Sequence, residues 1–570
     1  MKSSQLPPSM KRPAIVYGDK APTILDTTLG HLIDELSDIH GDKVAVDFPW
    51  QSIRRTFSEL RKSSKLVASS LLSAGLCPGD RVGILTGNRY EFLDVFMAAA
   101  RIGCPAVILQ SHMSPGEMKA AAIKSGCKLL FIAPPPGSRL LLQYLDILSF
   151  PHHSASQIQR IIVLEDMVEL KDRTEIQSYS NFLLGADNHP LLESAQQAVQ
   201  PSDILCLMFT SGTTGNPKAA VLIHRNVVNN SHFFSRACDI QPSDIICSPL
   251  PLCHSFGLVC AFLGSFIRGS LIVFPSEKFS ADTLVDLFQD RDITVIYGVP
   301  TMFFAVLEKS QRRSHKPRSL VKAIVGGAPV PYALITQIFQ EMRPQYVLNG
   351  YGMTETSPAT FVTPLGHCSE SSLKTIGKVM PHTNAKIVDR DGRIVQQGEK
   401  GELCISGLPL QKGYWEDEEK TSEIMKRDAD GVSWLHTGDE AIIGEDEHCT
   451  ITGRIKDIII RGGLNISPVE IEDRLTLHPL IQEASVVGLP DKTRGEIVAC
   501  FLKQYVDRQR PSDEAIRIWV RESLGWHKAP EAMLWIGDAG IGEDFPKTAS
   551  GKHRKEKLKA IGTYLLAGKT

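Results

Sequence analysis

A loop of glycines and hydroxyl side chains follows the apolar run at residues 204–209, which predicts a buried strand. Glycines let backbone amides approach an anion closely, hydroxyls donate hydrogen bonds, and a lysine at the end of the loop adds positive charge. The spacing differs from the familiar P-loop, which has four residues between its first glycine and Gly-Lys. An ordinary strand-connecting turn is the alternative. The candidate phosphate ligands are Thr210, Ser211, Gly212, Thr213, Thr214, Gly215 and Lys218.

Residues 349–356 form a second glycine-rich cluster, with the sequence Asn-Gly-Tyr-Gly-Met-Thr-Glu-Thr. Glycines on both sides of Tyr351 let an aromatic face lie flat against a planar ligand. Thr354 can donate a hydrogen bond to phosphate, and Glu355 offers a hard oxygen ligand for Mg²⁺. A glycine-rich turn with an incidental carboxylate is the alternative. The candidate nucleotide-contacting residues of this cluster are Asn349, Gly350, Tyr351, Gly352 and Thr354, and Glu355 is the candidate metal ligand.

Three later segments carry polar groups that suit a nucleotide substrate. Asp439 follows a His-Thr-Gly turn, and a carboxylate there can accept both hydroxyls of a ribose. Residues 453–466 place charges around a short β-branched strand, and Gly462 with Gly463 permits a sharp hairpin or close approach of a long ligand. Lys552 ends a run of small residues suited to deliver an ammonium group into a cleft. An Asx turn, a charged hairpin edge and a solvated lysine are the respective alternatives.

Helix and strand signals alternate in the first third of the chain. The elements that they predict must help to position the candidate nucleotide-binding groups. Capping boxes formed by Thr56 with Glu59 and by Ser114 with Glu117 predict two helix starts. This alternation predicts parallel strands with helices packed on both faces. Strands are predicted over residues 80–85, 105–109 and 128–133, and a further helix over residues 90–102.

The rest of the chain is predicted to contain further separate units. Residues 134–200 are proline-rich and polar, and are predicted to connect the first α/β unit to a second one at residues 203–365. Short β runs near residues 386–405 predict a small β-rich unit, and the segment beyond Arg454 predicts a final α+β unit.

The composition is that of a globular enzyme and argues against several classes of function. A net charge of −2 over 570 residues disfavours broad electrostatic binding of nucleic acid or anionic membranes. The longest apolar stretch, near residues 258–267, is far shorter than the ~20 residues that span a bilayer. Twelve cysteines without a Cys-x-x-Cys pair favour reduced thiols and a cytoplasmic location. Mitochondrion and peroxisome stay open as alternatives.

Taken in order, the five segments resemble the signatures of the adenylate-forming superfamily, which contains acyl-CoA synthetases, aryl-CoA ligases, luciferases and adenylation domains. The resemblance runs from about residue 30 to the end of the chain. Residues 249–257 and 297–303 are most similar to medium-chain and related acyl-CoA synthetases. A sixth segment resembles the turn that contacts adenine and borders the acyl pocket, and its residues are Gly326, Gly327, Ala328 and Pro329.

The resemblance implies an α/β and α+β multidomain fold. An N-terminal AMP-binding domain at residues 1–453 is expected to hold two α/β units and the small β-rich unit. A hinge is expected at residues 454–457, with Lys456 as its pivot. A small mobile C-terminal α+β domain at residues 458–570 is expected to carry Lys552.

The implied chemistry is the activation of a small-molecule carboxylic acid by ATP, with Mg²⁺, followed by acyl transfer to coenzyme A. By resemblance, residues 210–218 hold the β- and γ-phosphates, and Tyr351 covers the adenine. Asp439 and Arg454 fix the ribose in the same way. Transfer of AMP gives the acyl carbon a good leaving group, so positioning and charge stabilisation should dominate catalysis.

Three residues are implied to act at the reacting atoms. Lys552 would bridge the acyl carboxylate and the α-phosphate, and Thr354 would touch the α-phosphate. His254 is expected at the mouth of the acyl pocket, with a packed core histidine as the alternative. In the second half-reaction, rotation of the C-terminal domain would withdraw Lys552 and bring in a pantetheine channel lined by Arg461, Gly462 and Gly463.

Several readings of the function compete. An acyl-AMP ligase that loads a carrier-protein thiol is the nearest alternative to a CoA ligase, because both acceptors present pantetheine. A non-catalytic nucleotide-binding homologue has no need for Lys552, and a luciferase-like oxygenase is more remote. Small glycines beside Val299, Met353 and Phe256 predict an apolar cavity for an uncharged acyl tail. Fatty, branched and aromatic acids all stay open.

Overall fold

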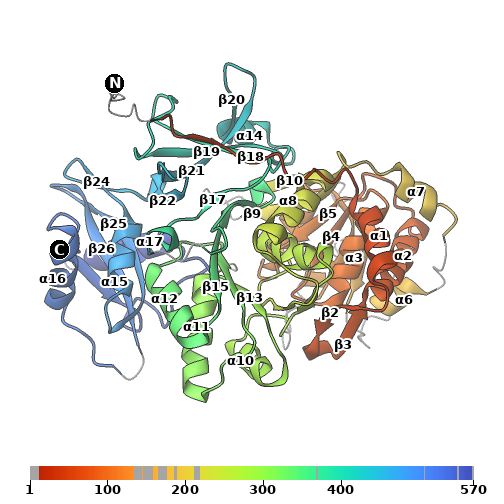
Figure 1. Ribbon diagram of the computed structural model, residues 1–570, viewed down its shortest axis with the longest axis horizontal. Helices are drawn as coiled ribbons and strands as arrows, with labels where there is room; N and C mark the ends of the chain where they lie inside the picture. The colour runs from red at the N-terminus through yellow and green to blue at the C-terminus, as the bar shows by residue number, and fades with distance from the viewer. Residues whose placement is uncertain are drawn as a thin grey trace, which may run out of the picture.

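The computed structural model describes residues 12–133, 144–145, 158–164, 176–184, 189–210, 218–366, 370–505, 508–548 and 551–567. Within these ranges the strands form four sheets. Two large sheets build the body of the molecule, a smaller sheet lies beside them, and a fourth sheet forms a C-terminal lobe. This lobe lies at the opposite end of the molecule from the helices α1 (Leu29–His40) and α2 (Phe57–Ser73) (Figure 1).

The first large sheet has parallel neighbours throughout, except for one antiparallel pair at its edge. Apolar side chains alternate between its faces, as the twofold period of a strand requires. Ile84 and Ile108 enter the central core, whereas Leu85 and Leu109 enter an outer core. In spatial order the strands are β10 (Lys218–Ile223), β9 (Ile204–Thr210), β5 (Ala106–Leu109), β4 (Arg81–Leu85), β6 (Cys127–Ile132), β7 (Arg160–Val163) and β8 (Ile176–Ser178).

The second large sheet is parallel in its centre and antiparallel at both edges. In spatial order its strands are β17 (Lys378–Val379), β16 (Ala359–Val362), β15 (Tyr346–Gly352), β14 (Lys322–Gly326), β13 (Val295–Gly298), β11 (Ile245–Cys247), β12 (Leu271–Val273), β2 (Val44–Phe48) and β3 (Ile53–Thr56).

Helices cover both faces of each large sheet, so that five layers alternate. The layer between the sheets contains α1, α2, α3 (Tyr90–Arg101), α8 (His224–Ala237) and α9 (Gly264–Ile267). The outer face of the seven-stranded sheet is covered by α4 (Pro115–Lys124). The outer face of the nine-stranded sheet is covered by α10 (Ala281–Asp290), α11 (Pro300–Arg313) and α12 (Tyr332–Met342). The short helices α6 (Tyr179–Leu183) and α7 (Leu192–Ala198) come between β8 and β9 in the sequence.

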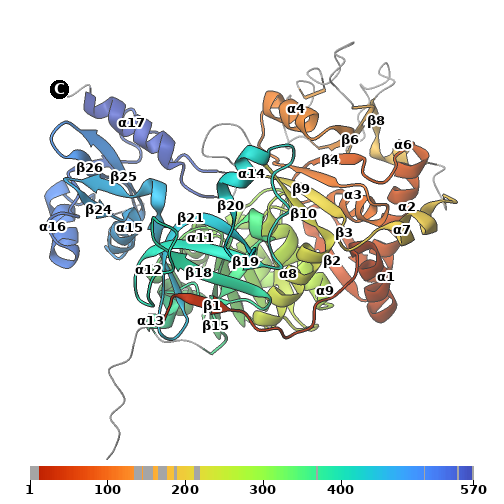
Figure 2. The same ribbon diagram turned by 90° about the horizontal axis from the view of Figure 1, so that it is seen from above.

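Two smaller sheets complete the fold (Figure 2). One contains β1 (Ile15–Tyr17), β18 (Thr383–Val388), β19 (Gly401–Gly407), β21 (Ser433–Ile443), β20 (Met425–Arg427) and β22 (Cys449–Arg454), and α14 (Glu418–Ile424) precedes β20. The C-terminal lobe contains β24 (Leu464–Ile466), β23 (Ile459–Arg461), β26 (Gly495–Gln504), β25 (Ile481–Asp491) and β27 (Ala532–Trp535). On one face of the lobe's sheet lie α15 (Pro468–Thr476) and α16 (Asp513–Leu524), and on the other lies α17 (Lys555–Ala567).

The fold class, the helix starts and the early strands agree with the sequence-based predictions. Both capping boxes form, since Thr56 and Ser114 each accept a backbone hydrogen bond from the glutamate three residues later. Two predictions about organisation are wrong. Residues 134–200 are more than a connection, because β7 and β8 extend the first sheet. The two α/β units are not consecutive either, because β2 and β3 join the second sheet while β9 and β10 complete the first.

In the described part of the chain, no helix is long and apolar enough to cross a membrane. The predicted domain limits at residues 453 and 458 stay a prediction. The last strand of the small sheet ends at Arg454 and the first strand of the lobe begins at Ile459, with the 3₁₀ turn η5 (Ile455–Asp457) between them.

An ion pair of a fully buried arginine with a partly buried aspartate should stabilise the central helix layer. Arg101 is fully buried at the end of α3, forms an ion pair with Asp34 on α1 at 2.9 Å, and donates to Gln196 at 2.7 Å. Arg101→Leu leaves these acceptors without their partner, so we expect the free energy of unfolding to fall by about 3 kcal/mol. The midpoint of urea unfolding measures this change. Arg393→Leu is the control, because the exposed pair of Arg393 with Asp391 should contribute less than about 0.5 kcal/mol. Equal effects of both changes would contradict the assignment.

Candidate active site

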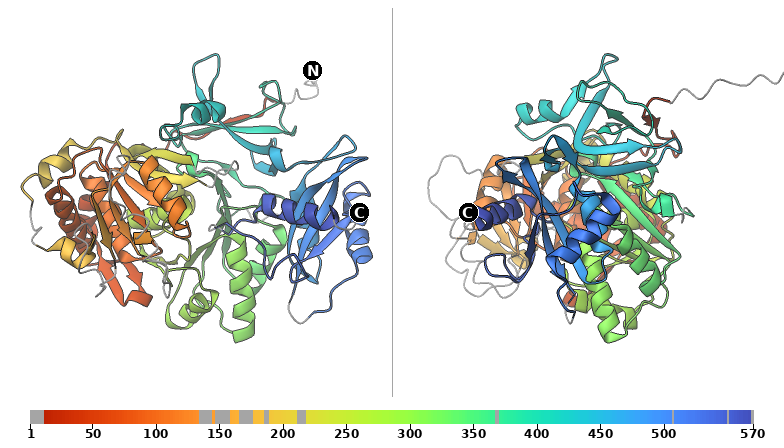
Figure 3. Two further views of the ribbon diagram at one scale, coloured as in Figure 1. Left: turned by 180° about the vertical axis from the view of Figure 1, so that it is seen from behind. Right: turned by 90° about the vertical axis from the view of Figure 1, so that its left-hand side faces the viewer.

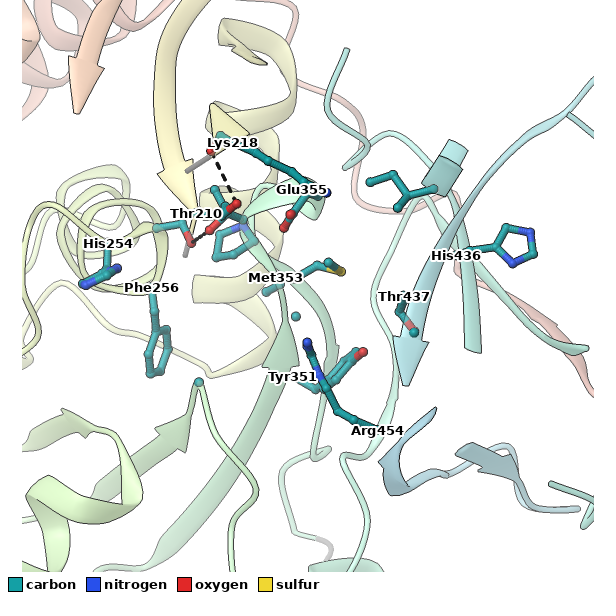
Figure 4. A pocket seen from close by; sticks show the side chains of 18 of the residues that line it. Thr210, Lys218, His254, Phe256, Tyr351, Met353, Glu355, His436, Thr437 and Arg454 are labelled. Atoms are coloured by element: carbon teal, nitrogen blue, oxygen red, sulfur yellow. Dashed lines mark hydrogen bonds between the residues drawn. The ribbon is translucent and has the colours of Figure 1, made fainter. Parts of the chain in front are cut away.

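A cavity of about 630 Å³ lies where the ends of both large sheets meet the small sheet and the C-terminal lobe. Figure 4 shows its polar lining, with Thr210 and Lys218 on one side and Tyr351 beside Arg454 on another. The lining includes twelve of the predicted site residues, which come from segments far apart in the sequence: Thr210, Lys218, His254, Gly327, Gly350, Tyr351, Gly352, Thr354, Glu355, Arg454, Lys456 and Lys552. Gly438, the neighbour of the predicted residue Asp439, also lines the cavity.

The predicted phosphate loop is the connection of the antiparallel pair β9–β10. Thr210 and Lys218 are register partners, and the Thr210 hydroxyl donates to the Lys218 carbonyl oxygen at 3.4 Å. The loop therefore starts and ends at a fixed place on the rim of the cavity. Five of the predicted ligands lie outside the described residues: Ser211, Gly212, Thr213, Thr214 and Gly215.

Glu355 and Lys218 are linked by an aromatic side chain that the sequence did not single out. Tyr414 donates its phenol proton to Glu355 Oε1 at 2.7 Å, and the Lys218 ammonium lies 5.1 Å from the centroid of the Tyr414 ring. Burial and the Glu355 charge raise the pKa of Tyr414, so the phenol stays a donor. Glu355 and Thr354 both belong to the short turn η4 (Thr354–Thr356) and line the cavity, where Thr354 lies 3.4 Å from the Ser255 hydroxyl.

The Asp439 carboxylate is held by two neighbours at the cavity wall. Tyr351 donates to Asp439 Oδ2 at 2.6 Å, and Arg454 Nε pairs with Asp439 Oδ1 at 2.7 Å. Asp439 and Arg454 are cross-strand partners on β21 and β22, so the sheet register itself sets this pair. Asp439 is only 5% exposed and sits directly behind Arg454 and Gly438. Burial and the adjacent carboxylate raise the pKa of Tyr351 well above its usual value.

Glu402, which the sequence analysis missed, holds the turn that presents Asp439. Its Oε2 lies 2.7 Å from His436 Nδ1, and its Oε1 accepts the Gly438 backbone N–H at 3.1 Å. Burial alone would raise the pKa of Glu402, but the bonds from His436 and Gly438 outweigh burial and lower it. The pairing of β19 with β21 brings Glu402 close to His436 and Gly438. No local sequence pattern predicts that pairing.

Lys552 reaches the cavity from the C-terminal lobe. Its loop touches the body of the molecule where the Gly551 carbonyl oxygen accepts from the Thr301 hydroxyl at 3.4 Å. Lys552 is exposed toward the open cavity. Desolvation by the surrounding residues and the positive charge of Arg454 lower the pKa of Lys552, whereas the negative charges of Asp439 and Glu355 oppose that decrease. Figure 3 shows the lobe beside the body, with α17 directed toward the centre of the molecule.

The opposite end of the cavity is apolar. Phe234 and Phe256 meet edge-to-face with ring centroids 6.4 Å apart, and Tyr297 packs behind Phe256 at 5.9 Å. A Cβ atom added to Gly350 would lie 3.3 Å from the Phe234 ring. The apolar residues that line the cavity include Phe209, Phe234, Phe256, Cys260, Met353 and Ala359.

Val299 lies between the wall of the cavity and the loop of Lys552. A Cβ added to Gly327 would come within 3.3 Å of one Val299 methyl, and one added to Gly551 within 3.2 Å of the other. Both glycines also have φ near +80°, which favours glycine. Side chains at either position would therefore disturb the close approach of the loop to the cavity wall.

His254 lines the cavity as a neutral imidazole. Its Nε2 is buried, and within the described residues it has no hydrogen-bond partner. Burial lowers the pKa of His254 to about 4, and the positive charge of Lys552 contributes to the decrease. A neutral imidazole with a free nitrogen can accept from or donate to a bound group without adding charge.

Several predicted site residues lie away from the cavity lining. Ala328 and Pro329 follow Gly327 toward the surface, and the Asn349 side chain donates to the Thr375 carbonyl oxygen at 3.1 Å. Arg461 pairs with Glu531 at 2.6 Å, and Gly462 with Gly463 forms the exposed turn between β23 and β24. The predicted roles of these residues stay predictions.

The protonation of His254 provides a test of this site. Because the pKa is lowered from about 6.5 to about 4, the unfolded chain binds the proton more tightly than the folded chain between these values. The contribution of neutral His254 to the free energy of unfolding is therefore complete above pH 6.5, and it is lost as the pH falls toward 4. We expect ¹⁵N-histidine NMR, assigned with His254→Gln, to show a neutral ring at pH 5.5. A midpoint near 6.5 would contradict the buried geometry.

Comparisons with known proteins identify the family and the fold of the chain. The model of the AMP-binding enzyme family matches residues 34–415, and that of the AMP-binding enzyme C-terminal domain matches residues 470–552. The solved structure of the anthranilate CoA ligase AuaEII in complex with anthranoyl-AMP shares the fold, with a TM-score of 0.82 at 22% identity over 95% of this chain and 98% of that chain.

Relatives match over almost their full length. The acyl-CoA ligase cnsG of Penicillium expansum is 73% identical, over 100% of this chain and 100% of its own. The acyl-CoA ligase sidI of Aspergillus fumigatus is 42% identical, over 97% of this chain and 94% of its own. The mitochondrial medium-chain acyl-CoA ligase ACSF2 of Danio rerio is 32% identical, over 95% of this chain and 90% of its own. The chain belongs to the AMP-binding, adenylate-forming enzyme family, in its acyl-CoA ligase branch.

Proposed function

We propose that this cavity joins a carboxylic acid with an apolar tail to AMP and that the acyl group then passes to the thiol of coenzyme A. In the first step a carboxylate oxygen attacks the α-phosphorus of ATP, and pyrophosphate leaves. In the second step the CoA sulfur attacks the acyl carbon, and AMP leaves. The observation that carries the proposal is the position of Lys552, whose ammonium shares one cavity with Lys218, Thr354 and Tyr351.

The charges around the cavity suit a polyphosphate at one end. Lys218 and the loop that precedes it would hold the outgoing pyrophosphate, and Arg454 with Asp439 would hold the ribose. Lys552 would stabilise charge that grows between the acyl and phosphate oxygens in the transition state. Tyr351 lies on the cavity wall with its hydroxyl bound to Asp439, which leaves its ring to contact the adenine.

The residues beside Lys218 fit a magnesium ion. Glu355 supplies one carboxylate, and Mg²⁺ in nucleotide sites commonly takes one or two carboxylates plus phosphate oxygens and water. Tyr414 occupies one oxygen of Glu355 and leaves the other for the ion. When bound, Mg²⁺ would offset the phosphate charge. Tyr414 would keep the carboxylate oriented, and Lys218 would hold the phosphate end of the substrate.

The opposite end of the cavity suits an uncharged tail. Its phenylalanines offer apolar contact, and the described residues that line this end include no lysine or arginine for a second carboxylate. Neutral His254 lies beside Phe256 at the junction of the two ends, where a polar carboxylate would meet the apolar wall. We therefore propose monocarboxylic acids as the substrate class.

The acceptor and the location follow from weaker observations. Three relatives with full-length matches are acyl-CoA ligases, which supports CoA over a carrier-protein thiol as the acceptor. The cysteines in the described part of the chain are free, which supports a reducing compartment such as the cytoplasm. A non-catalytic nucleotide-binding role is the second candidate and is separated by the following experiment.

Lys552→Ala should separate the two half-reactions. We expect carboxylate-dependent ATP–pyrophosphate exchange to fall by about 100-fold or more, because transition-state charge loses its cation. Thioester formation from supplied acyl-AMP and CoA should change less than about threefold, since Lys552 would be withdrawn in that step. Lys557→Ala, an exposed lysine on α17, is the matched control. Equal losses in both half-reactions, with the protein folded, would contradict the proposed alternation of the lobe.

The acyl end of the cavity predicts substrate preference. A panel of monocarboxylic and dicarboxylic acids in the exchange assay should favour apolar monocarboxylic acids. Gly350→Ala places a methyl group against Phe234, so it should raise the KM for longer or bulkier acids by about tenfold. A preference for dicarboxylic acids would contradict the proposed substrate class. Binding of ATP without exchange for any acid would favour the non-catalytic role.

A further inference from the structure

We infer that Glu483 is a positioning residue for the Lys552 loop, acting through His553 and Lys547. This inference rests on the proposed function, because it assigns a support to the lysine that the function requires. Glu483 lies on β25 of the C-terminal lobe, does not line the cavity and is only 8% exposed. It therefore lies outside both the polar and the apolar end of the cavity.

Lys552 lies close to the base of a small hairpin. Lys547 and His553 form an antiparallel bridge at its base. Inside that bridge, the Thr548 N–H donates to the Lys552 carbonyl oxygen at 2.7 Å, and the Lys552 N–H donates to the Thr548 hydroxyl at 3.1 Å. The backbone of Lys552 therefore follows the orientation of the hairpin base.

Glu483 binds both sides of that base. Its Oε2 lies 3.0 Å from the Lys547 ammonium and 3.1 Å from His553 Nε2. The His553 ring also stacks on Phe545, with the ring centroids 4.2 Å apart. Burial would raise the pKa of Glu483, but the bonds from His553 and Lys547 outweigh it and keep the carboxylate charged. One buried charge thus fixes two side chains on opposite strands of the hairpin.

The same stretch of β25 also contacts the body of the molecule. Gln482, next to Glu483, donates to Glu308 on α11 at 3.0 Å. The pairing register of β25 shifts between Ile481 and Glu483, and such a bulge redirects adjacent side chains. Near the start of α11, Thr301 contacts Gly551. The strand that holds the hairpin base is therefore attached to the helix that receives the hairpin tip.

The test uses the full-length protein and three variants. Glu483→Gln removes the charge with little change of shape, and His553→Leu removes the donor to Glu483. His553→Gln keeps a side-chain donor near the position of Nε2. Glu514→Gln, an exposed carboxylate on α16, is the matched control. Each variant is assayed for ATP–pyrophosphate exchange, for thioester formation from supplied acyl-AMP and CoA, and for its Tm.

We expect Glu483→Gln and His553→Leu to lower exchange by about 10- to 100-fold, as small misplacements of a reacting group do. Thioester formation should change less than about threefold, and His553→Gln should recover most of the exchange. Parallel losses in both half-reactions with a lowered Tm would overturn the inference in favour of a general structural role. Unchanged exchange would also overturn it. Lys552→Ala is run alongside: if that variant keeps its exchange activity, the proposed function of Lys552 fails independently of Glu483.

Discussion

The bonds made by the Asp439 carboxylate join the separate parts of this molecule at the site. Tyr351 belongs to the nine-stranded sheet, whereas Arg454 is the last residue of the small sheet before the lobe begins. Asp439 therefore links the nine-stranded sheet to the small sheet, at the residue after which the chain continues into the C-terminal lobe. An unpaired carboxylate at this depth would be costly, so the two contacts are needed for the fold as well as for any ligand.

The cavity separates two kinds of chemistry along its length. Its polar end gathers cations from residues as distant in sequence as Lys218 and Lys552, and its apolar end is closed by Phe234 and Phe256. Such a division fits a reaction that brings a polyphosphate and an apolar acid together at one carboxylate. The neutral state of His254 maintains the division, because burial keeps a charge from the junction.

Much of this arrangement could be predicted from local sequence. Capping boxes gave the starts of α2 and α4, apolar runs gave β4 to β6 and β9, and the ordered motifs gave the family. The position of β2 and β3 in the second sheet was not predictable in this way. It depends on pairing between residues more than 200 positions apart in the sequence, such as Ile272 with Val46. Glu402, Tyr414 and Glu483 were missed for the same reason: each acts through a partner that only the tertiary fold brings near.

Val299 connects the size of the acyl tail to the position of Lys552. Its two methyl groups face opposite neighbours, the cavity wall at Gly327 and the lysine loop at Gly551, and a Cβ added to either glycine would lie closer to Val299 than an ordinary van der Waals contact. Since closely packed groups transmit displacement rather than absorb it, an acid too bulky for the wall would also push the loop away from the reacting atoms. The enzyme would then discriminate among acids by how fast they react once bound, in addition to how tightly they bind.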